Sequence, residues 1–234
     1  MGHCLQRGIV PECLFVCGEI LQGEDRNALL PLCEKANPDC QVVEVPSHLY
    51  SRIAYREGTE GILGVMRTPP TDLESFRGRL SSPNPLVIVL EGVEKPGNIG
   101  AILRSADAAG VDGVLICDSP TDLFNPNLIR ASIGAVFTRN IALCSTQEAI
   151  EFLREESFSV LTAQLQDSRA YYDTDMKGAT AIVMGTEATG LTPAWRQAAT
   201  SHIMIPMLGQ LDSLNVSVSA AILLFEAVRQ RQTT

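Results

Sequence analysis

From Leu86 onward, short uninterrupted apolar runs alternate with helical patterns, and this alternation restricts the possible folds more than any other feature of the chain. Runs such as 86–90 and 181–184 contain no polar residue, which is typical of parallel strands buried on both faces. We therefore expect an α/β domain in which helices cover both faces of a parallel sheet. The expected strands are 86–91, 113–117, 139–143, 159–163, 180–184 and 202–206. The expected helices are 98–109, 126–136, 146–156, 193–199 and 214–231.

The N-terminal part of the chain predicts a second, smaller α/β module. Its three apolar runs and two helical patterns lie at 13–17, 41–45, 61–66, 26–36 and 47–55. A Pro- and Ser-rich stretch then predicts a linker. The expected division is a module at 1–68, a linker at 69–85 and the larger domain at 86–234.

Composition argues against several classes of protein. No apolar run reaches the roughly 18 residues that a membrane-spanning helix needs. The seven cysteines include no Cys-x-x-Cys pair and there are only three histidines, so we expect no metal site. Thiols scattered in this way indicate a reduced, cytoplasmic protein. Cys117 and Cys144 lie in apolar runs and are expected to be buried thiols.

The first polar loop after an expected strand contains Gly97, Asn98 and Gly100 and leads to Arg104. The glycines permit a close backbone approach, and Asn98 can cap the helix that follows. The spacing is not that of a dinucleotide-binding loop, so it does not indicate a nicotinamide cofactor. Taken alone, the loop is also explained as an ordinary strand-to-helix turn with an exposed arginine.

Two further loops repeat this arrangement. Gly185, Glu187 and Gly190 follow the strand expected at 180–184, and Glu187 can accept from an amine or from Arg104. The third loop leads from Ile205 and Met207 to Ser213, Leu214 and Asn215, where the last helix begins with free backbone donors. Apolar Ile205 and Leu214 beside such donors suit a flat heteroaromatic ring. Helix capping is the alternative explanation for each loop alone, whereas three such loops in one α/β chain indicate a shared ligand site.

The three loops together resemble the three ordered motifs of the SpoU (TrmH-like) RNA 2′-O-ribose methyltransferases, which belong to the SPOUT superfamily. The resemblance covers about residues 86–231. A further Arg-x-Ser-x-Gly pattern at Arg130, Ser132 and Gly134 resembles the segment of this family that faces the substrate. The matching motifs are Asn98-x-Gly100-x-x-x-Arg104, Met184-Gly185-x-Glu187-x-x-Gly190-Leu191 and Ile205-Pro206-Met207 followed by Ser213-Leu214-Asn215.

The resemblance implies a sheet whose C-terminal segment forms a deep trefoil knot, S-adenosylmethionine as cofactor, and a homodimer joined through the catalytic domain. The first 68 residues resemble a small ribosomal-protein-like domain that recognises RNA. That domain is expected to be N-terminally incomplete, since the family places another strand and helix before the segment that starts at Leu5. The residues that the resemblance assigns to the cofactor are Thr162, Gly185, Glu187, Gly190, Ile205, Met207, Leu214 and Asn215.

The expected reaction is methylation of a ribose 2′-hydroxyl in structured RNA, with ribosomal RNA favoured over transfer RNA. Arg104 is the family's proposed catalytic residue, but its pKa makes it a poor general base. We therefore expect it to clamp a phosphate and the developing oxyanion. Glu187 would fix Arg104, while Asn98, Ser213 and Asn215 would orient the ribose and the loops. An inactive RNA-binding homologue and an enzyme that methylates a base nitrogen are the alternatives.

The net charge of −9 argues mildly against an RNA partner, so any contact with phosphates must come from local patches. Arg52, Arg56 and Arg67 form the arginine concentration of the small module. A solvated face paired with nearby glutamates explains this group equally well. The residues expected to contact RNA are Arg52, Arg56, Arg104 and Arg130.

Overall fold

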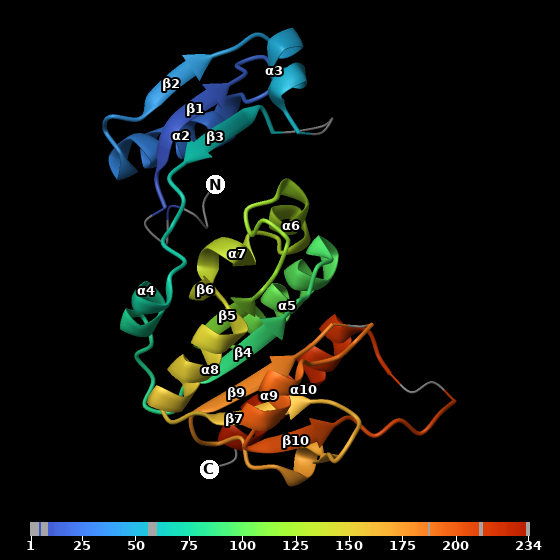
Figure 1. Cartoon of the computed structure of the whole chain (residues 1–234). Helices are drawn as coiled ribbons and strands as arrows, with labels where there is room; N and C mark the ends of the chain where they lie inside the picture. The colour runs from blue at the N-terminus through green and yellow to red at the C-terminus, as the bar shows by residue number, and fades with distance from the viewer. Residues whose placement is uncertain (1–4, 6–8, 56–59, 187, 211–212, 233–234) are drawn as a thin grey trace. The chain divides into compact units, whose positions relative to one another are not determined.

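The computed structural model describes residues 5, 9–55, 60–186, 188–210 and 213–232 (Figure 1). The chain divides into two compact units, Met1–Pro69 and Pro70–Thr234. Within the described residues, no helix is both long and apolar enough to cross a membrane.

The first unit holds one three-stranded sheet in the order β2-β1-β3. Strand β1 (Pro11–Val16) pairs in parallel with β2 (Gln41–Glu44) and antiparallel with β3 (Ile62–Met66). The helices are α2 (Gly23–Ala36) and α3 (Ser47–Ile53). Leu14 and Val16 form a small core with Cys33 of α2, whereas all four residues of β2 are exposed.

The second unit is built on a seven-stranded sheet in the order β6-β5-β4-β9-β7-β10-β8, in which the paired strands are parallel. The strands are β4 (Leu86–Glu91), β5 (Gly113–Cys117), β6 (Ile141–Cys144), β7 (Ser159–Ala163), β8 (Arg169–Ala170), β9 (Thr180–Met184) and β10 (Ser201–Met204). The helices are α4 (Leu73–Gly78), α5 (Pro96–Ala108), α6 (Pro126–Ala131), α7 (Ala135–Thr138), α8 (Thr146–Glu155), α9 (Pro193–Ala198) and α10 (Val216–Gln232), with a 3-10 turn at Tyr171–Asp173.

Helices cover both faces of this sheet, as the apolar runs predict. Alternate residues of β4 point to opposite cores, so that all six are buried. Ile88 belongs to the core shared with α5 and α10. Val89 belongs to the core shared with Phe152 of α8 and Trp195 of α9.

The predicted linker at 69–85 instead contributes helix α4 to the second unit. Asp72 caps this helix by accepting from the backbone N–H of Ser75 at 2.7 Å. Phe76 is fully buried and meets the ring of Phe152 edge-on, with centroids 5.7 Å apart. A Cβ at Gly113 would lie 2.4 Å from the Phe76 ring, so the absence of a side chain at Gly113 makes room for it. One buried aromatic residue therefore outweighs the Pro- and Ser-rich composition of the segment.

The helix predicted at 126–136 is two helices. Ile133 and Gly134 have φ values of 51° and 83°, and this left-handed pair ends α6 and starts α7 in a new direction. Glycine adopts this conformation at little cost, but a β-branched residue does so rarely. The sequence pattern gave no sign that Ile133 would.

The C-terminal helix is fastened at its far end. Gln230 is buried; its side chain accepts from the Met176 N–H at 2.9 Å and donates to the Thr174 carbonyl at 3.0 Å. Arg231 donates to the backbone carbonyls of Met176, Asn84 and Gly178. The last turn of α10 thus holds two separate segments of the chain, 174–178 and the one at Asn84.

Candidate functional site

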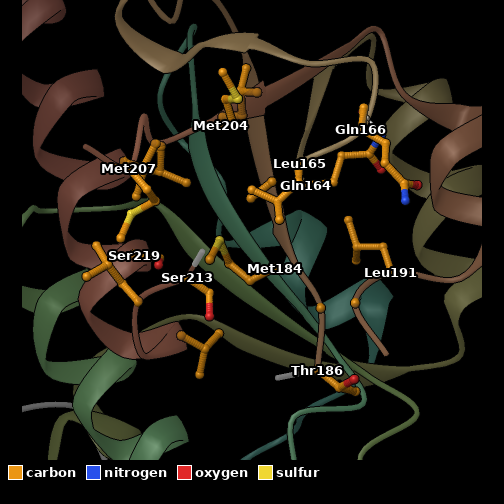
Figure 2. A pocket seen from close by; sticks show the side chains of 18 of the residues that line it. Gln164, Leu165, Gln166, Met184, Thr186, Leu191, Met204, Met207, Ser213 and Ser219 are labelled. Atoms are coloured by element: carbon orange, nitrogen blue, oxygen red, sulfur yellow. Dashed lines mark hydrogen bonds between the residues drawn. The ribbon is translucent and has the colours of Figure 1, made fainter. Parts of the chain in front are cut away.

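A cavity of about 670 Å³ lies where the loops after β7, β9 and β10 meet the start of α10 (Figure 2). The carboxyl ends of parallel strands share one edge of a sheet, and ligands of open α/β sheets bind there. The lining residues are Ala163, Gln164, Leu165, Gln166, Met184, Gly185, Thr186, Gly190, Leu191, Arg196, Ile203, Met204, Ile205, Met207, Ser213, Leu214, Asn215, Val216, Ser219 and Leu223.

The loop after β9 folds tightly back on itself. A Cβ at Gly185 would lie 2.5 Å from the backbone of Gly190, so any other residue at this position would displace the loop. Thr186 and Gly190 exchange two backbone hydrogen bonds, and Gly190 has a φ of 68°. Glu187, predicted for both catalysis and cofactor binding, lies outside the described residues.

The loop before α10 connects the cavity to the first motif. Asn215 accepts from the backbone N–H of Ser217 at 2.9 Å and from its hydroxyl at 2.6 Å, which caps the helix. The Asn215 amide also donates to the Asn98 side-chain oxygen at 3.2 Å. The structure therefore joins two predicted catalytic residues that are 117 positions apart, and Asn215 also lines the cavity.

The predicted cofactor residues mostly line this cavity. Gly185, Gly190 and the apolar group Ile205, Met207 and Leu214 all do so. So does Ser213, which was predicted to orient the ribose.

Thr162 is the exception among the described members of that set. It is fully buried, its hydroxyl shares a hydrogen bond of 2.6 Å with His202 Nδ1, and it is not among the lining residues. Its side chain ties β7 to β10, which are paired at this register.

The predicted RNA-contacting arginines of the second unit are exposed. Arg104 on α5 and Arg130 on α6 have no hydrogen-bond or ion-pair partner within the part of the chain that the structure describes. The two helices touch, since a Cβ at Gly100 would fall 2.5 Å from Ala131 Cβ. Arg104 lies one turn after Gly100 on the same face of α5. The structure does not place Arg104 at the cavity wall.

The three predicted arginines of the first unit differ in their surroundings. Arg52 is exposed at the end of α3. Arg67 pairs with Glu12, with a shortest N–O distance of 2.7 Å. Arg56 lies outside the described residues, as do Glu57 and its neighbours up to 59.

The sequence pattern missed a buried carboxylate that holds the second loop in place. Glu91 ends β4 with 4% of its surface exposed. It accepts from the Thr192 N–H at 2.8 Å, from the Thr192 hydroxyl at 2.6 Å and from the Thr146 hydroxyl at 3.1 Å. Thr192 directly follows Leu191 of the cavity wall, so Glu91 fixes the point at which the loop leaves the cavity. A charged residue ending an otherwise apolar strand was the available signal.

The cavity wall also includes Gln164, Gln166 and Arg196, which no motif identified. The two glutamines follow β7 directly, so the strand-end rule that located the other loops applies to them as well. Arg196 comes from α9, a helix with no motif residue.

At the other end of the sheet, Cys117 and Cys144 face each other across β5 and β6, with Sγ atoms 3.9 Å apart. The hydrogen bond to Cys144 and burial raise the pKa of the Cys117 thiol. Cys117 is buried as predicted, whereas Cys144 is partly exposed. Within the described residues, no cluster of three or more His, Cys, Asp or Glu side chains could hold a metal ion.

A parallel sheet with a ligand cavity at its carboxyl edge defines an α/β ligand-binding domain, and comparison with known proteins makes this class specific. Residues 85–225 match the SpoU rRNA Methylase family. The chain is 32% identical over 222 residues to the 23S rRNA (guanosine-2′-O-)-methyltransferase RlmB of Escherichia coli K12, covering 91% of this chain and 89% of that protein. It is also 32% identical to the 23S rRNA (adenosine(1067)-2′-O)-methyltransferase of Streptomyces azureus, over 86% of this chain and 73% of that protein.

Solved structures show the same relationship. A crystal structure of an RNA 2′-O ribose methyltransferase has a TM-score of 0.78 and 36% identity, covering 99% of this chain and 85% of that one. An AdoMet-bound rRNA methyltransferase from Sinorhizobium meliloti has a TM-score of 0.82 and 28% identity, covering 97% of this chain and 82% of that one. The chain therefore belongs to the SpoU rRNA methylase family, which confirms the predicted resemblance. It is a methyltransferase, and its cofactor is S-adenosylmethionine.

Proposed function

We propose that this chain methylates the ribose 2′-hydroxyl of one nucleotide in 23S ribosomal RNA. The observation that carries the proposal is the Asn98–Asn215 hydrogen bond, which connects the cofactor cavity to the loop that leads to Arg104. The relatives named for 23S rRNA 2′-O-methylation match nearly the whole chain, the first unit included. This extent favours ribosomal over transfer RNA.

The cavity suits S-adenosylmethionine in size and chemistry. Its volume of about 670 Å³ lies in the range of small-molecule sites. Ile205, Met207 and Leu214 offer an apolar slot for the adenine, and the backbone of Gly185 and Gly190 is open to close approach. When bound, the cofactor supplies an electrophilic methyl group.

Arg104 is proposed to hold the RNA at the reaction centre. A guanidinium stays protonated at neutral pH, so it stabilises a phosphate and a developing oxyanion rather than removing a proton. Arg104 has no partner among the described residues, and neither has Arg130 on the adjacent helix. Two unpaired guanidiniums on touching helices suit a ribose-phosphate backbone. Asn98, Asn215, Ser213 and Glu187 are proposed to orient the ribose and the loops.

A deep trefoil knot is proposed for the C-terminal segment. Its support is the strand order, because β10 lies on the far side of β7 from β9, which precedes it in the chain. Connections that thread a loop are rare among folds. In this order, the chain between β9 and β10 must cross β7 before α10 returns to pack on α5.

A homodimer formed through α10 is also proposed. Val218 and Phe225 of this helix are 47% and 48% exposed, although the opposite side of α10 lies in the core. Exposed apolar residues spaced along one helix are typical of a helix–helix interface. Charge substitution of both, Val218→Asp with Phe225→Asp, should convert a sedimenting dimer into a monomer. A wild-type chain that sediments as a monomer at micromolar concentration would exclude the interface.

The first unit is proposed to bind the RNA substrate, with Arg52 and Arg56 as its phosphate contacts. Exposed Arg52 on α3 supports this role. Arg67 is the weaker candidate, since Glu12 already neutralises it.

The reaction is tested with the purified full chain, radiolabelled S-adenosylmethionine and three substrates: protein-free 23S rRNA, protein-free 16S rRNA and bulk tRNA. We expect label in 23S rRNA alone, at one nucleotide that resists alkaline cleavage on its 3′ side. Such resistance requires a blocked 2′-hydroxyl, so it separates ribose from base methylation. Label confined to tRNA, or to a nucleotide that alkali still cleaves, would overturn the proposal.

A further inference from the structure

Helices α5, α6 and α8 of the second unit end in the same hydrogen-bonded turn. In each, the residue after the C-cap has a positive φ, and the N–H of the following residue donates to a carbonyl of the last helical turn. The residues with positive φ are Gly110 after α5 (66°), Ile133 after α6 (51°) and Ser157 after α8 (57°). The residues that follow them and donate back are Val111, Gly134 and Phe158.

The order of residue types in this turn is reversed at α6. At α5 and α8 a small residue takes the positive φ, and the apolar residue that follows it is buried. At α6 the glycine comes second, and Ile133 takes the positive φ with 64% of its surface exposed. A β-branched residue is disfavoured in this conformation, and exposure removes the compensation that burial would give. Neither the turn nor the core therefore accounts for an isoleucine at this position.

The turn presents Ile133 from a fixed backbone. Helix α6 packs against α5 (Figure 1). Ser132 is buried, and its hydroxyl donates to the Ile129 carbonyl at 3.0 Å. Gly100 of α5 approaches the same segment closely, since a Cβ at Gly100 would lie 2.8 Å from the Ser132 nitrogen. The chain that leads to Ile133 is thus held by its own helix and by α5.

The charges around this turn favour a nucleic acid as its partner. Arg130, three residues before Ile133, and Arg104 on α5 are both exposed. Guanidiniums contact phosphates, whereas an exposed aliphatic side chain can pack on the apolar face of a base. A protein partner would have to supply carboxylates to both arginines, but RNA carries a phosphate at every nucleotide. The combination of one apolar residue and two arginines therefore fits RNA better than a protein surface.

We infer that Ile133 packs against an unstacked base in the rRNA segment that carries the reacting ribose, with Arg130 on a neighbouring phosphate. The inference rests on the proposed rRNA substrate. Bases in loops and bulges of RNA expose a face to such contacts, whereas a base inside a continuous helix is stacked on both faces. Ile133 would thus favour an unpaired target over a double-stranded one. A residue held in a disfavoured conformation at a substrate-facing turn is consistent with this role.

The test measures equilibrium binding of the full chain to protein-free 23S rRNA at several salt concentrations. Ile133→Gly should weaken binding by about tenfold, the scale of one buried aliphatic side chain, and should leave the salt slope unchanged because no charge is lost. Ile133→Leu keeps an apolar side chain and should retain most of the affinity. Arg130→Gln should instead reduce the salt slope by about one unit. S-adenosylhomocysteine affinity should stay at the wild-type value in all three, since neither residue lines the cavity.

Ser157→Gly is the matched control. It removes a side chain from the same backbone conformation after α8, where Arg154 takes the place that Arg130 has in α6. Both glycine variants should be at least as stable as wild type in urea, because glycine adopts a positive φ at little cost. A loss of RNA binding confined to Ile133→Gly would then be a loss of contact and not of folding.

Unchanged RNA affinity in Ile133→Gly would overturn the inference. Conversion of a dimer into a monomer by this variant would assign Ile133 to a contact between two copies of the chain instead. Methylation is measured separately from binding. A wild-type chain that binds 23S rRNA without methylating it would contradict the proposed reaction alone, and the comparison of Ile133 variants would still decide the base contact.

Discussion

The two sheets of this protein differ in how completely they are covered. Every residue of β4 in the second unit is buried, whereas every residue of β2 in the first unit is exposed. A strand buried on both faces holds the loops at its end in fixed positions, so the second unit can build a defined cavity from distant parts of the chain. A small sheet with a four-residue core cluster has less to fix its surface. We therefore expect cofactor binding to depend on rigid geometry, and the RNA binding proposed for the first unit to depend on charge.

The largest effect is expected where the rigid geometry is tightest. Gly185→Ala places a Cβ 2.5 Å from the Gly190 backbone, so the loop must move and the cofactor slot with it. We expect S-adenosylhomocysteine affinity to fall by about a hundredfold or more, because several contacts are lost together. Calorimetry measures this, with Gly97→Ala as control, since a Cβ there meets nothing within 4 Å. Wild-type affinity in Gly185→Ala would show that the loop is adaptable after all.

Catalysis should separate from cofactor binding at Arg104. Arg104→Ala should lower turnover on 23S rRNA by roughly two orders of magnitude, as expected when one charge-stabilising donor is removed. Its cofactor affinity should match wild type, because Arg104 does not line the cavity. Single-turnover kinetics measure the loss in the methyl-transfer rate, and calorimetry measures the cofactor affinity. Near-normal turnover would leave Arg104 without a role in the transition state.

The buried carboxylate of the second unit should matter more to stability than a surface carboxylate of the first. Glu91→Ala leaves the Thr192 N–H and two hydroxyls without their acceptor, and we expect a loss of about 2–4 kcal/mol in the free energy of unfolding. Glu44→Ala removes only an exposed ion pair with Arg26, and its effect should be much smaller. Urea denaturation compares them. Equal effects would contradict the contrast between the two sheets.

Charge in the first unit should control the salt dependence of RNA binding. Reversal of Arg52 and Arg56 to glutamate should weaken binding and reduce the salt slope by about one unit per lost contact, with cofactor affinity unchanged. An unaltered slope would move RNA recognition to Arg130. Arg139 of the same unit is engaged within the fold, since it pairs with Asp107 at 2.9 Å and donates to the Val111 carbonyl.

The smallest effect concerns pH. Hydrogen bonds from the backbone and hydroxyl of Ser145, at the start of α8, lower the pKa of Glu148 below its usual value. A carboxylate whose pKa is lower in the folded state adds stability above its unfolded pKa, and this stability is lost as pH falls through the folded pKa. Glu148→Gln should therefore be slightly less stable than wild type at neutral pH, and the difference should vanish as pH falls through the folded pKa, which flattens the acid side of the stability profile. A steeper acid limb would contradict the capping role.

The sequence predicted six of the seven strands of the second unit, all but the two-residue β8, and it located the three loops, because strand burial and strand-end chemistry leave local patterns. Gly185, Leu214 and Asn215 could be found in this way. Arg196 could not, since its place at the cavity depends on how Trp195 anchors α9 in a core made of distant residues. Glu91 was missed because its partners, Thr192 and Thr146, are 101 and 55 positions away. The left-handed turn at Ile133 follows from tertiary packing that overrides the local preference of a β-branched residue.

The fastening of α10 has a consequence for how the protein yields to force. A force applied to the chain after α10 acts first on Arg231 and then on buried Gln230. The Arg231 guanidinium donates hydrogen bonds to the backbone carbonyls of Asn84, Met176 and Gly178. The last turn of the helix cannot unwind first, because it is tied to two other segments of the chain at once. A protein-unfolding machine or a processive protease that pulls on the chain after α10 must break these hydrogen bonds before it can unwind the helix. Arg231→Ala should therefore shorten the dwell time before such a machine advances.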